Sequence, residues 1–204
     1  RICAENVRIH HQQQMDRVEM QWMDEVRPGQ FAGEKITPIP SAGLYVPRGK
    51  GAFPSVMYML CTPAVIAGVK NIAVCTPPTP DGGIDAASLV AADICGVRNV
   101  YKAGGAQAIA ALAYGTETVP KGSQVNGPGN PYVAAAKRLL SDIINPGMPA
   151  GPSEAIILAD HTADPWNTAL DLLNEQEHGP DSASVLVTPS RELAEQVIAY
   201  LPEI

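Results

Sequence analysis

From residue 43 onward, short apolar runs alternate with Ala-rich stretches of helical length. Apolar runs without polar alternation are typical of strands covered on both faces, and a helix between two of them returns the chain to the same edge of a parallel sheet. The alternation therefore predicts an α/β fold, with Rossmann-like parallel sheets flanked by helices. We expect strands over 43–46, 71–75, 99–101, 124–126, 155–159 and 184–187. We expect helices over 54–67, 84–95, 106–114, 132–143, 165–176 and 191–200.

Residues 1–26 have a different character, because they are rich in Glu, Gln, Arg and Met and contain neither Gly nor Pro. This composition predicts one long N-terminal helix that ends before Arg27-Pro28-Gly29. The chain begins at Arg1 rather than at a methionine, so we expect it to be a segment of a longer protein.

Charge and cysteine use exclude several kinds of partner. The net charge of −7 argues against a nucleic acid or an anionic membrane surface, since either would need a basic face. Gly, Pro or charge interrupts every apolar run before the roughly 20 residues that cross a bilayer. The 4 cysteines are widely spaced and form no C-x-x-C pair, which favours buried thiols in a reducing compartment. We expect a cytoplasmic protein.

Two glycine-rich loops each follow a predicted strand and open a predicted helix. They are Gly104-Gly105-Ala106-Gln107 and Gly127-Pro128-Gly129-Asn130. The free amides and the dipole of a helix N-terminus favour a phosphate group there. Neither spacing is the G-x-G-x-x-G fingerprint, and close packing of helix on strand would also explain such glycines. The two loops together indicate a nucleotide site with Gln107 and Asn130 as donors.

Two further segments carry polar side chains that suit a reaction centre. Ser153 and Glu154 lie in a turn before a predicted strand, where a hydroxyl and a carboxylate serve either a substrate or the turn itself. Glu175 and His178 are three residues apart near a helix end, so both project from one face. They are candidate ligands of a divalent ion such as Zn²⁺; alternatively, a histidine there interacts with the helix dipole.

Taken in order, these loops resemble the histidinol dehydrogenase family, zinc enzymes that oxidise L-histidinol to L-histidine through the aldehyde with NAD. The resemblance extends over nearly the whole chain. The matching segments are 43–47, 104–117, 127–130, 150–154 and 177–182.

The resemblance implies a role for individual residues. The family's NAD contacts fall on Tyr45, Gln107 and Asn130, and its substrate-binding serine falls on Ser153. Its helix-end zinc ligand falls on His178, and Glu175 stands where the family has a glutamine ligand, so both belong to the implied metal and substrate site.

The resemblance also implies which parts of the reaction centre this chain lacks. The family's acid–base Glu-His pair and its remaining zinc ligands match nothing in this chain. We therefore expect no catalytic residue in this segment and place the acid–base pair beyond Ile204. The family further implies a homodimer with shared metal sites.

The resemblance divides the chain into parts. Residues 1–42 form a helical lead-in to the first domain, 43–150 a Rossmann-like domain on the NAD side, and 151–204 the start of a returning α/β domain.

Two alternatives to histidinol oxidation stay open. The family's Pro-Gly-Gly turn reads Pro47-Arg48-Gly49 here and is followed by Lys50. Glu175, Arg48 and Lys50 together favour a related dehydrogenase of another small alcohol, including an anionic one. The second alternative is a nucleotide-binding module without catalytic activity.

Overall fold

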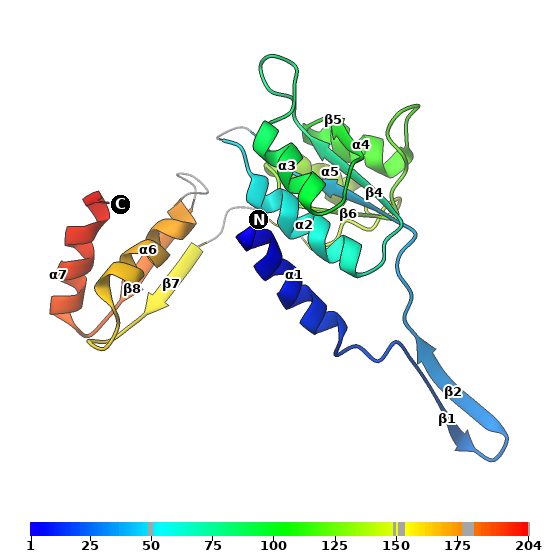
Figure 1. Cartoon of the computed structure of the whole chain (residues 1–204), viewed down its shortest axis with the longest axis horizontal. Helices are drawn as coiled ribbons and strands as arrows, with labels where there is room; N and C mark the ends of the chain where they lie inside the picture. Colours follow the sequence, from blue (N-terminus) through cyan, green and yellow to red (C-terminus); the bar gives the residue numbers. More distant parts are fainter. Residues whose placement is uncertain (49–50, 149, 151–153, 177–181, 204) are drawn as a thin grey trace. The chain divides into compact units, whose positions relative to one another are not determined.

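The computed structural model describes residues 1–48, 51–148, 150, 154–176 and 182–203 (Figure 1). Its contacts divide the chain into two compact units, residues 1–151 and residues 152–204. Each unit has its own hydrophobic core, so each is described by itself.

The first unit contains a four-stranded parallel sheet with the strand order β5-β4-β3-β6. Its central strands β3 and β4 are almost fully buried, as their apolar sequences predict. The α/β class with parallel strands is confirmed. The strands are β3 (Ser41–Tyr45), β4 (Asn71–Thr76), β5 (Val100–Lys102) and β6 (Gln124–Asn126).

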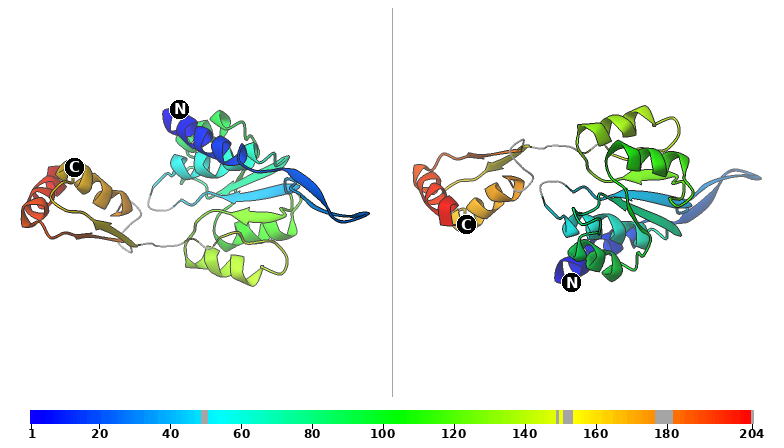
Figure 2. Two further views of the ribbon diagram at one scale, coloured as in Figure 1. Left: turned by 90° about the horizontal axis from the view of Figure 1, so that it is seen from below. Right: turned by 90° about the horizontal axis from the view of Figure 1, so that it is seen from above.

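Helices cover both faces of this sheet, because alternate side chains of one strand point to opposite faces. Leu44 and Val74 pack in the core beneath α2 and α3, whereas Tyr45 and Cys75 pack in the core beneath α4 and α5. Figure 2 shows α4 and α5 on the face opposite α2. The helices are α2 (Pro54–Ile66), α3 (Ala86–Ile94), α4 (Gly105–Tyr114) and α5 (Pro131–Leu139).

The N-terminal segment corrects the prediction of one long helix over residues 1–26. Helix α1 (Ile2–Met15) packs on α2 and is followed by an antiparallel hairpin of β1 (Gln21–Arg27) and β2 (Gln30–Lys35). Pro28 and Gly29, the latter with φ 76°, form the turn. The helix-favouring composition is overridden because cross-strand pairing satisfies the backbone hydrogen bonds of this segment. Every residue of the two strands is exposed.

The second unit contains the parallel strands β7 (Glu154–Leu158) and β8 (Ala183–Val187) with α6 (Pro165–Gln176) and α7 (Arg191–Tyr200). A short 3₁₀ turn, η1 (Leu201–Glu203), follows α7. Ile157 and Leu186 pack against buried residues of the two helices, while alternate strand residues such as Leu158 are exposed. Within the described residues, no helix combines the length and the apolar character needed to cross a membrane.

Candidate functional site

Strands β4 and β5 are added on one side of β3, whereas β6 is added on the other, so the strand order switches direction between the adjacent parallel strands β3 and β6. The connections through α2 and α3 run along one face of the sheet, and those through α4 and α5 along the other. In an open parallel sheet, such a switch point leaves a crevice beyond the carboxyl ends of the strands, which is where ligands bind. Tyr45 ends β3 and Asn126 ends β6, so the residues after them define the candidate site.

Tyr45 is a core residue whose hydroxyl reaches the site. Its side chain is 3% exposed, and its hydroxyl oxygen accepts a hydrogen bond from the backbone N–H of Gly105 at 3.0 Å. Helix α4 has Gly104 as its N-cap and no side-chain cap from that position, so the tyrosine supplies the acceptor instead. Burial raises the pKa of Tyr45, an effect that the Gly105 hydrogen bond partly offsets. The phenol is therefore protonated at neutral pH and retains an O–H donor.

The loop before α4 requires its glycines. A Cβ on Gly104 would lie 2.6 Å from Cγ of Pro77, which follows β4, and Gly105 has φ 64°. Gln107 is exposed, and its side chain folds back so that Oε1 lies 2.8 Å from the position of a Cβ on Gly105. Gln107 thus presents its amide beside the helix N-terminus, where the sequence places a donor.

The loop after β6 lies directly on β3. Gly127 has φ 120°, and a Cβ there would overlap the carbonyl oxygen of Tyr45. Asn130 ends the loop as the N-cap of α5, and its Oδ1 accepts a hydrogen bond from the N–H of Val133 at 3.0 Å. The amide NH₂ of Asn130 belongs to an exposed residue and is the group available to a ligand. Tyr45 therefore contacts both glycine-rich loops.

Lys137 is a residue of this region that sequence reasoning missed. It is 6% exposed on α5, and its Nζ donates to the carbonyl oxygen of Gly127 at 2.6 Å. Burial lowers the pKa of its ammonium group. The available signal was its position one helical turn after Val133, on the face that packs against the sheet.

Two cations from the chain segments on either side of β4 bind the loop after β4, Arg48 shortly after β3 and Lys102 at the end of β5. Arg48 donates from Nη1 to the carbonyl oxygen of Pro78 at 3.5 Å, and Lys102 donates from Nζ to that of Gly82 at 3.0 Å. In the described part of the chain, Nε of Arg48 is buried without a hydrogen-bond partner. A hydrogen bond from Thr79 is the main cause that lowers the pKa of Asp81 in this loop, and the charge of Arg48 lowers it further.

The other residues singled out by the sequence lie in the second unit or outside the described ranges. Glu175 is half-buried in the last turn of α6. Ser153 and His178 lie outside the described residues, as does Lys50. Ile204 also lies outside the described residues. The acid–base pair that the family resemblance places beyond Ile204 therefore stays a prediction.

The described residues do not complete a metal centre. Over the ranges that the structure describes, no group of three or more His, Cys, Asp or Glu side chains is placed to hold a metal ion. Tyr45, Gln107 and Asn130 lie at one edge of the sheet in the first unit. Glu175 belongs to the second unit.

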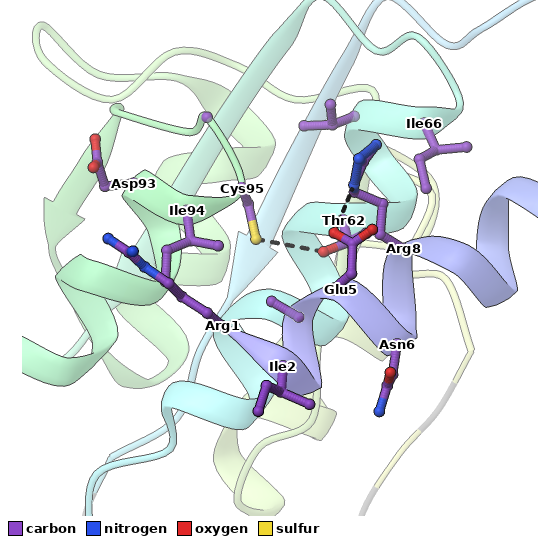
Figure 3. Close-up of a pocket in the computed structure, with 13 residues that line it drawn as sticks. Arg1, Ile2, Glu5, Asn6, Arg8, Thr62, Ile66, Asp93, Ile94 and Cys95 are labelled. Atoms are coloured by element: carbon purple, nitrogen blue, oxygen red, sulfur yellow. Dashed lines mark hydrogen bonds and ion pairs between the residues drawn. The ribbon is translucent and has the colours of Figure 1, made fainter.

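A cavity of ≈ 830 Å³ lies elsewhere, between α1, α2 and α3 (Figure 3). Its wall includes a hydrogen bond between Thr62 Oγ1 and Cys95 Sγ at 3.4 Å, and the charges of Glu5 and Arg8 pair at 3.3 Å. The residues that line it include none of the predicted site residues. This cavity therefore does not belong to the candidate site, which lies at the carboxyl ends of the sheet strands.

The fold and the loops at its switch point define an α/β protein of the doubly wound class. The sequence profile of histidinol dehydrogenase matches residues 1–204, so the chain belongs to the histidinol dehydrogenase family. This finding confirms the resemblance carried by the sequence motifs.

Individual relatives agree with the family. The chain is 59% identical to a histidinol dehydrogenase homolog of Rhizobium meliloti, over 98% of this chain and 43% of the relative. It is 62% identical to a histidinol dehydrogenase of Synechocystis sp., over 88% of this chain and 41% of the relative. A crystal structure of histidinol dehydrogenase from Elizabethkingia anophelis superposes with a TM-score of 0.88 at 40% identity, over 98% of this chain and 46% of the other. The chain spans less than half the length of these relatives.

Proposed function

We propose that the full-length protein is an NAD-dependent, zinc-assisted dehydrogenase that oxidises L-histidinol to L-histidine through the aldehyde. Family membership supports this assignment. The observation that carries the role of this chain is the bond between the Tyr45 hydroxyl and the N–H of Gly105, which joins β3 to the N-terminus of α4 at the switch point.

The carboxyl edge has the groups that a dinucleotide needs. The N-terminus of α4 begins at a glycine and carries the positive end of the helix dipole, which favours a phosphate group. Tyr45 offers its phenolic proton, and the amides of Gln107 and Asn130 offer further donors. When bound, NAD supplies the hydride acceptor, while these residues hold it against the sheet.

The proposal assigns Glu175 and His178 to the zinc site, with the other ligands and the acid–base pair supplied by the remainder of the full-length protein. A carboxylate and an imidazole are a donor set that zinc accepts. When bound, zinc would orient the alcohol oxygen and ease the loss of its proton. Glu175 places a negative charge where the family has a neutral glutamine.

The assignment is tested with the full-length enzyme, L-histidinol, NAD and zinc. We expect NADH to form, measured by its absorbance, and histidine to accumulate. Absence of NADH formation with L-histidinol, in a preparation shown to bind NAD and zinc, would overturn the substrate. A preparation that binds NAD but oxidises no alcohol would favour a nucleotide-binding relative without activity, whereas one that binds neither NAD nor zinc would favour an unrelated role.

A second candidate is the oxidation of another small alcohol that carries a negative charge. The observation that favours it is the half-buried Arg48 in the loop after β3, whose Nε has no partner among the described residues. Glu175 is the other departure from the family pattern. We expect Glu175→Gln to retain zinc and to shift the ratio of kcat/KM between L-histidinol and anionic alcohols. Unchanged zinc content together with an unchanged substrate ratio would remove Glu175 from the substrate site.

We further propose that the full-length protein is a cytoplasmic homodimer. The family resemblance favours a homodimer that shares its metal sites, and light scattering of the full-length protein measures this directly. All 4 cysteines are free thiols, which supports a cytoplasmic location.

A further inference from the structure

A buried lysine on α5 has no role in the function proposed above. Lys137 is 6% exposed and lies on the inner face of the helix with Val133 and Ala136. A buried ammonium is costly, and a methionine of similar length would fill the same space without that cost. Packing alone therefore does not account for a lysine at this position.

The one acceptor of this ammonium within the described residues is the carbonyl oxygen of Gly127, at 2.6 Å from Nζ. A charged donor makes a stronger and shorter hydrogen bond than a neutral one. Lys137 thus fixes the orientation of the peptide between Gly127 and Pro128, the first peptide of the loop. Asn130 fixes the other end by capping α5.

The position held by Lys137 is also the point where this loop contacts β3. A Cβ on Gly127 would overlap the carbonyl oxygen of Tyr45, so the backbones of the two residues are in close contact. The hydroxyl of Tyr45 in turn accepts from Gly105 at the N-terminus of α4. A continuous set of contacts therefore runs from Lys137 through Gly127 and Tyr45 to the second loop.

We propose that Lys137 is a positioning residue for the dinucleotide: its ammonium holds the loop 127–130 in its binding conformation and places a buried positive charge beside it. This inference rests on the proposed NAD site. The buried charge adds to the dipole of α5 and attracts the phosphate groups of the ligand. A neutral side chain at position 137 would fill the space but would neither hold Gly127 nor attract an anion.

The test uses the full-length enzyme and NAD, with binding measured by calorimetry and the KM for NAD by steady-state kinetics. Lys137→Met keeps the length and removes the charge. We expect its dissociation constant for NAD to rise about tenfold or more, with the KM for the alcohol within about twofold of the wild type. The melting temperature without NAD should stay within about 4 °C, because removal of the charge also removes its desolvation cost. Arg138→Met, at the adjacent exposed cation of α5, is the matched control and should bind NAD as the wild type does.

Two comparisons decide the result. Equal NAD affinities of Lys137→Met and Arg138→Met would overturn the role of Lys137 while leaving the NAD site intact. Failure of the wild type to bind NAD would overturn the proposed function itself. If Lys137→Met does not fold, Lys137→Arg and Lys137→Gln replace it. The arginine variant should then bind NAD more tightly than the glutamine variant, and the reverse order would overturn the assignment.

Discussion

The hydroxyl oxygen of Tyr45 lies 3.0 Å from the backbone nitrogen of Gly105 and caps helix α4 from the end of β3. A buried residue thereby links the sheet core to a helix N-terminus at the candidate nucleotide site. The same tyrosine supports the loop after β6 through its backbone. A change at Tyr45 should therefore affect both stability and ligand binding.

We expect Tyr45→Phe to lower the free energy of unfolding by about 0.5–1.5 kcal/mol, because the Gly105 N–H loses its acceptor. Its affinity for NAD should fall as well, because the phenolic proton is lost. Chemical denaturation and calorimetry measure the two effects. Tyr114→Phe is the control, since Tyr114 is 61% exposed and lies at the far end of α4. Wild-type NAD affinity of Tyr45→Phe would show that the hydroxyl serves the helix alone.

Gly127→Ala should displace the loop after β6 and abolish NAD binding. Alanine is strained at φ 120°, and its Cβ would overlap the carbonyl oxygen of Tyr45. We expect a loss of stability of about 1–3 kcal/mol. In Gly51→Ala, by contrast, the new Cβ meets nothing within 4 Å, so this control should bind NAD normally. Similar NAD affinities of the two variants would contradict the placement of the site at this loop.

Asn130 has two functions that substitutions can separate. Asn130→Ala should cost about 1 kcal/mol of stability, because α5 loses its cap. Asn130→Asp keeps an acceptor for the N–H of Val133, so it should preserve stability while weakening NAD binding through its negative charge. Ser190 caps α7 in the same way, and Ser190→Ala should lower the stability of the second unit without changing NAD affinity. Strong NAD binding by Asn130→Asp would exclude the amide as a ligand donor.

The thiols of Cys61 and Cys75 should be unreactive in the folded protein. Burial raises the pKa of each from the ordinary value of 9.0 to about 12, with a smaller contribution from Cys95 at Cys61. At pH 8, only about one molecule in 10⁴ then carries a reactive thiolate. Alkylation followed by mass spectrometry should show both cysteines modified readily after unfolding and at least about 100-fold more slowly before it.

The same pKa shifts set the pH dependence of stability. Because the folded state favours the protonated thiol, the two cysteines contribute stability below pH 9 that is lost as the pH rises toward 12. Replacing either cysteine with alanine should flatten the decline of the unfolding free energy over this range. An unchanged pH profile in both variants would contradict the burial of the thiols.

Local signals in the sequence were sufficient to predict the bounds of an element where its own residues determine where it begins and ends. Helices 165–176 and 191–200 begin and end as predicted, because Pro165 suits a first helical position and Ser190 caps the second helix through Leu193. Strand 124–126 also agrees. The hairpin over 21–35 could not be predicted from composition, since its strands satisfy each other's hydrogen bonds only after pairing.

The sequence by itself determined the α/β class, the alternation of strands and helices from residue 43 onward and the two glycine-rich loops, because apolar periodicity and turn residues act over short distances. Only the tertiary structure decided that Tyr45 caps a helix 60 residues away and that Lys137 holds the first peptide of the second loop. The first contact follows from the parallel strand order β5-β4-β3-β6, which brings the ends of β3 and β5 to one edge of the sheet, and the second from the packing of α5 back onto the loop after β6. A hydrogen bond between distant residues depends on how the whole sheet is assembled, and no local pattern in the sequence specifies that.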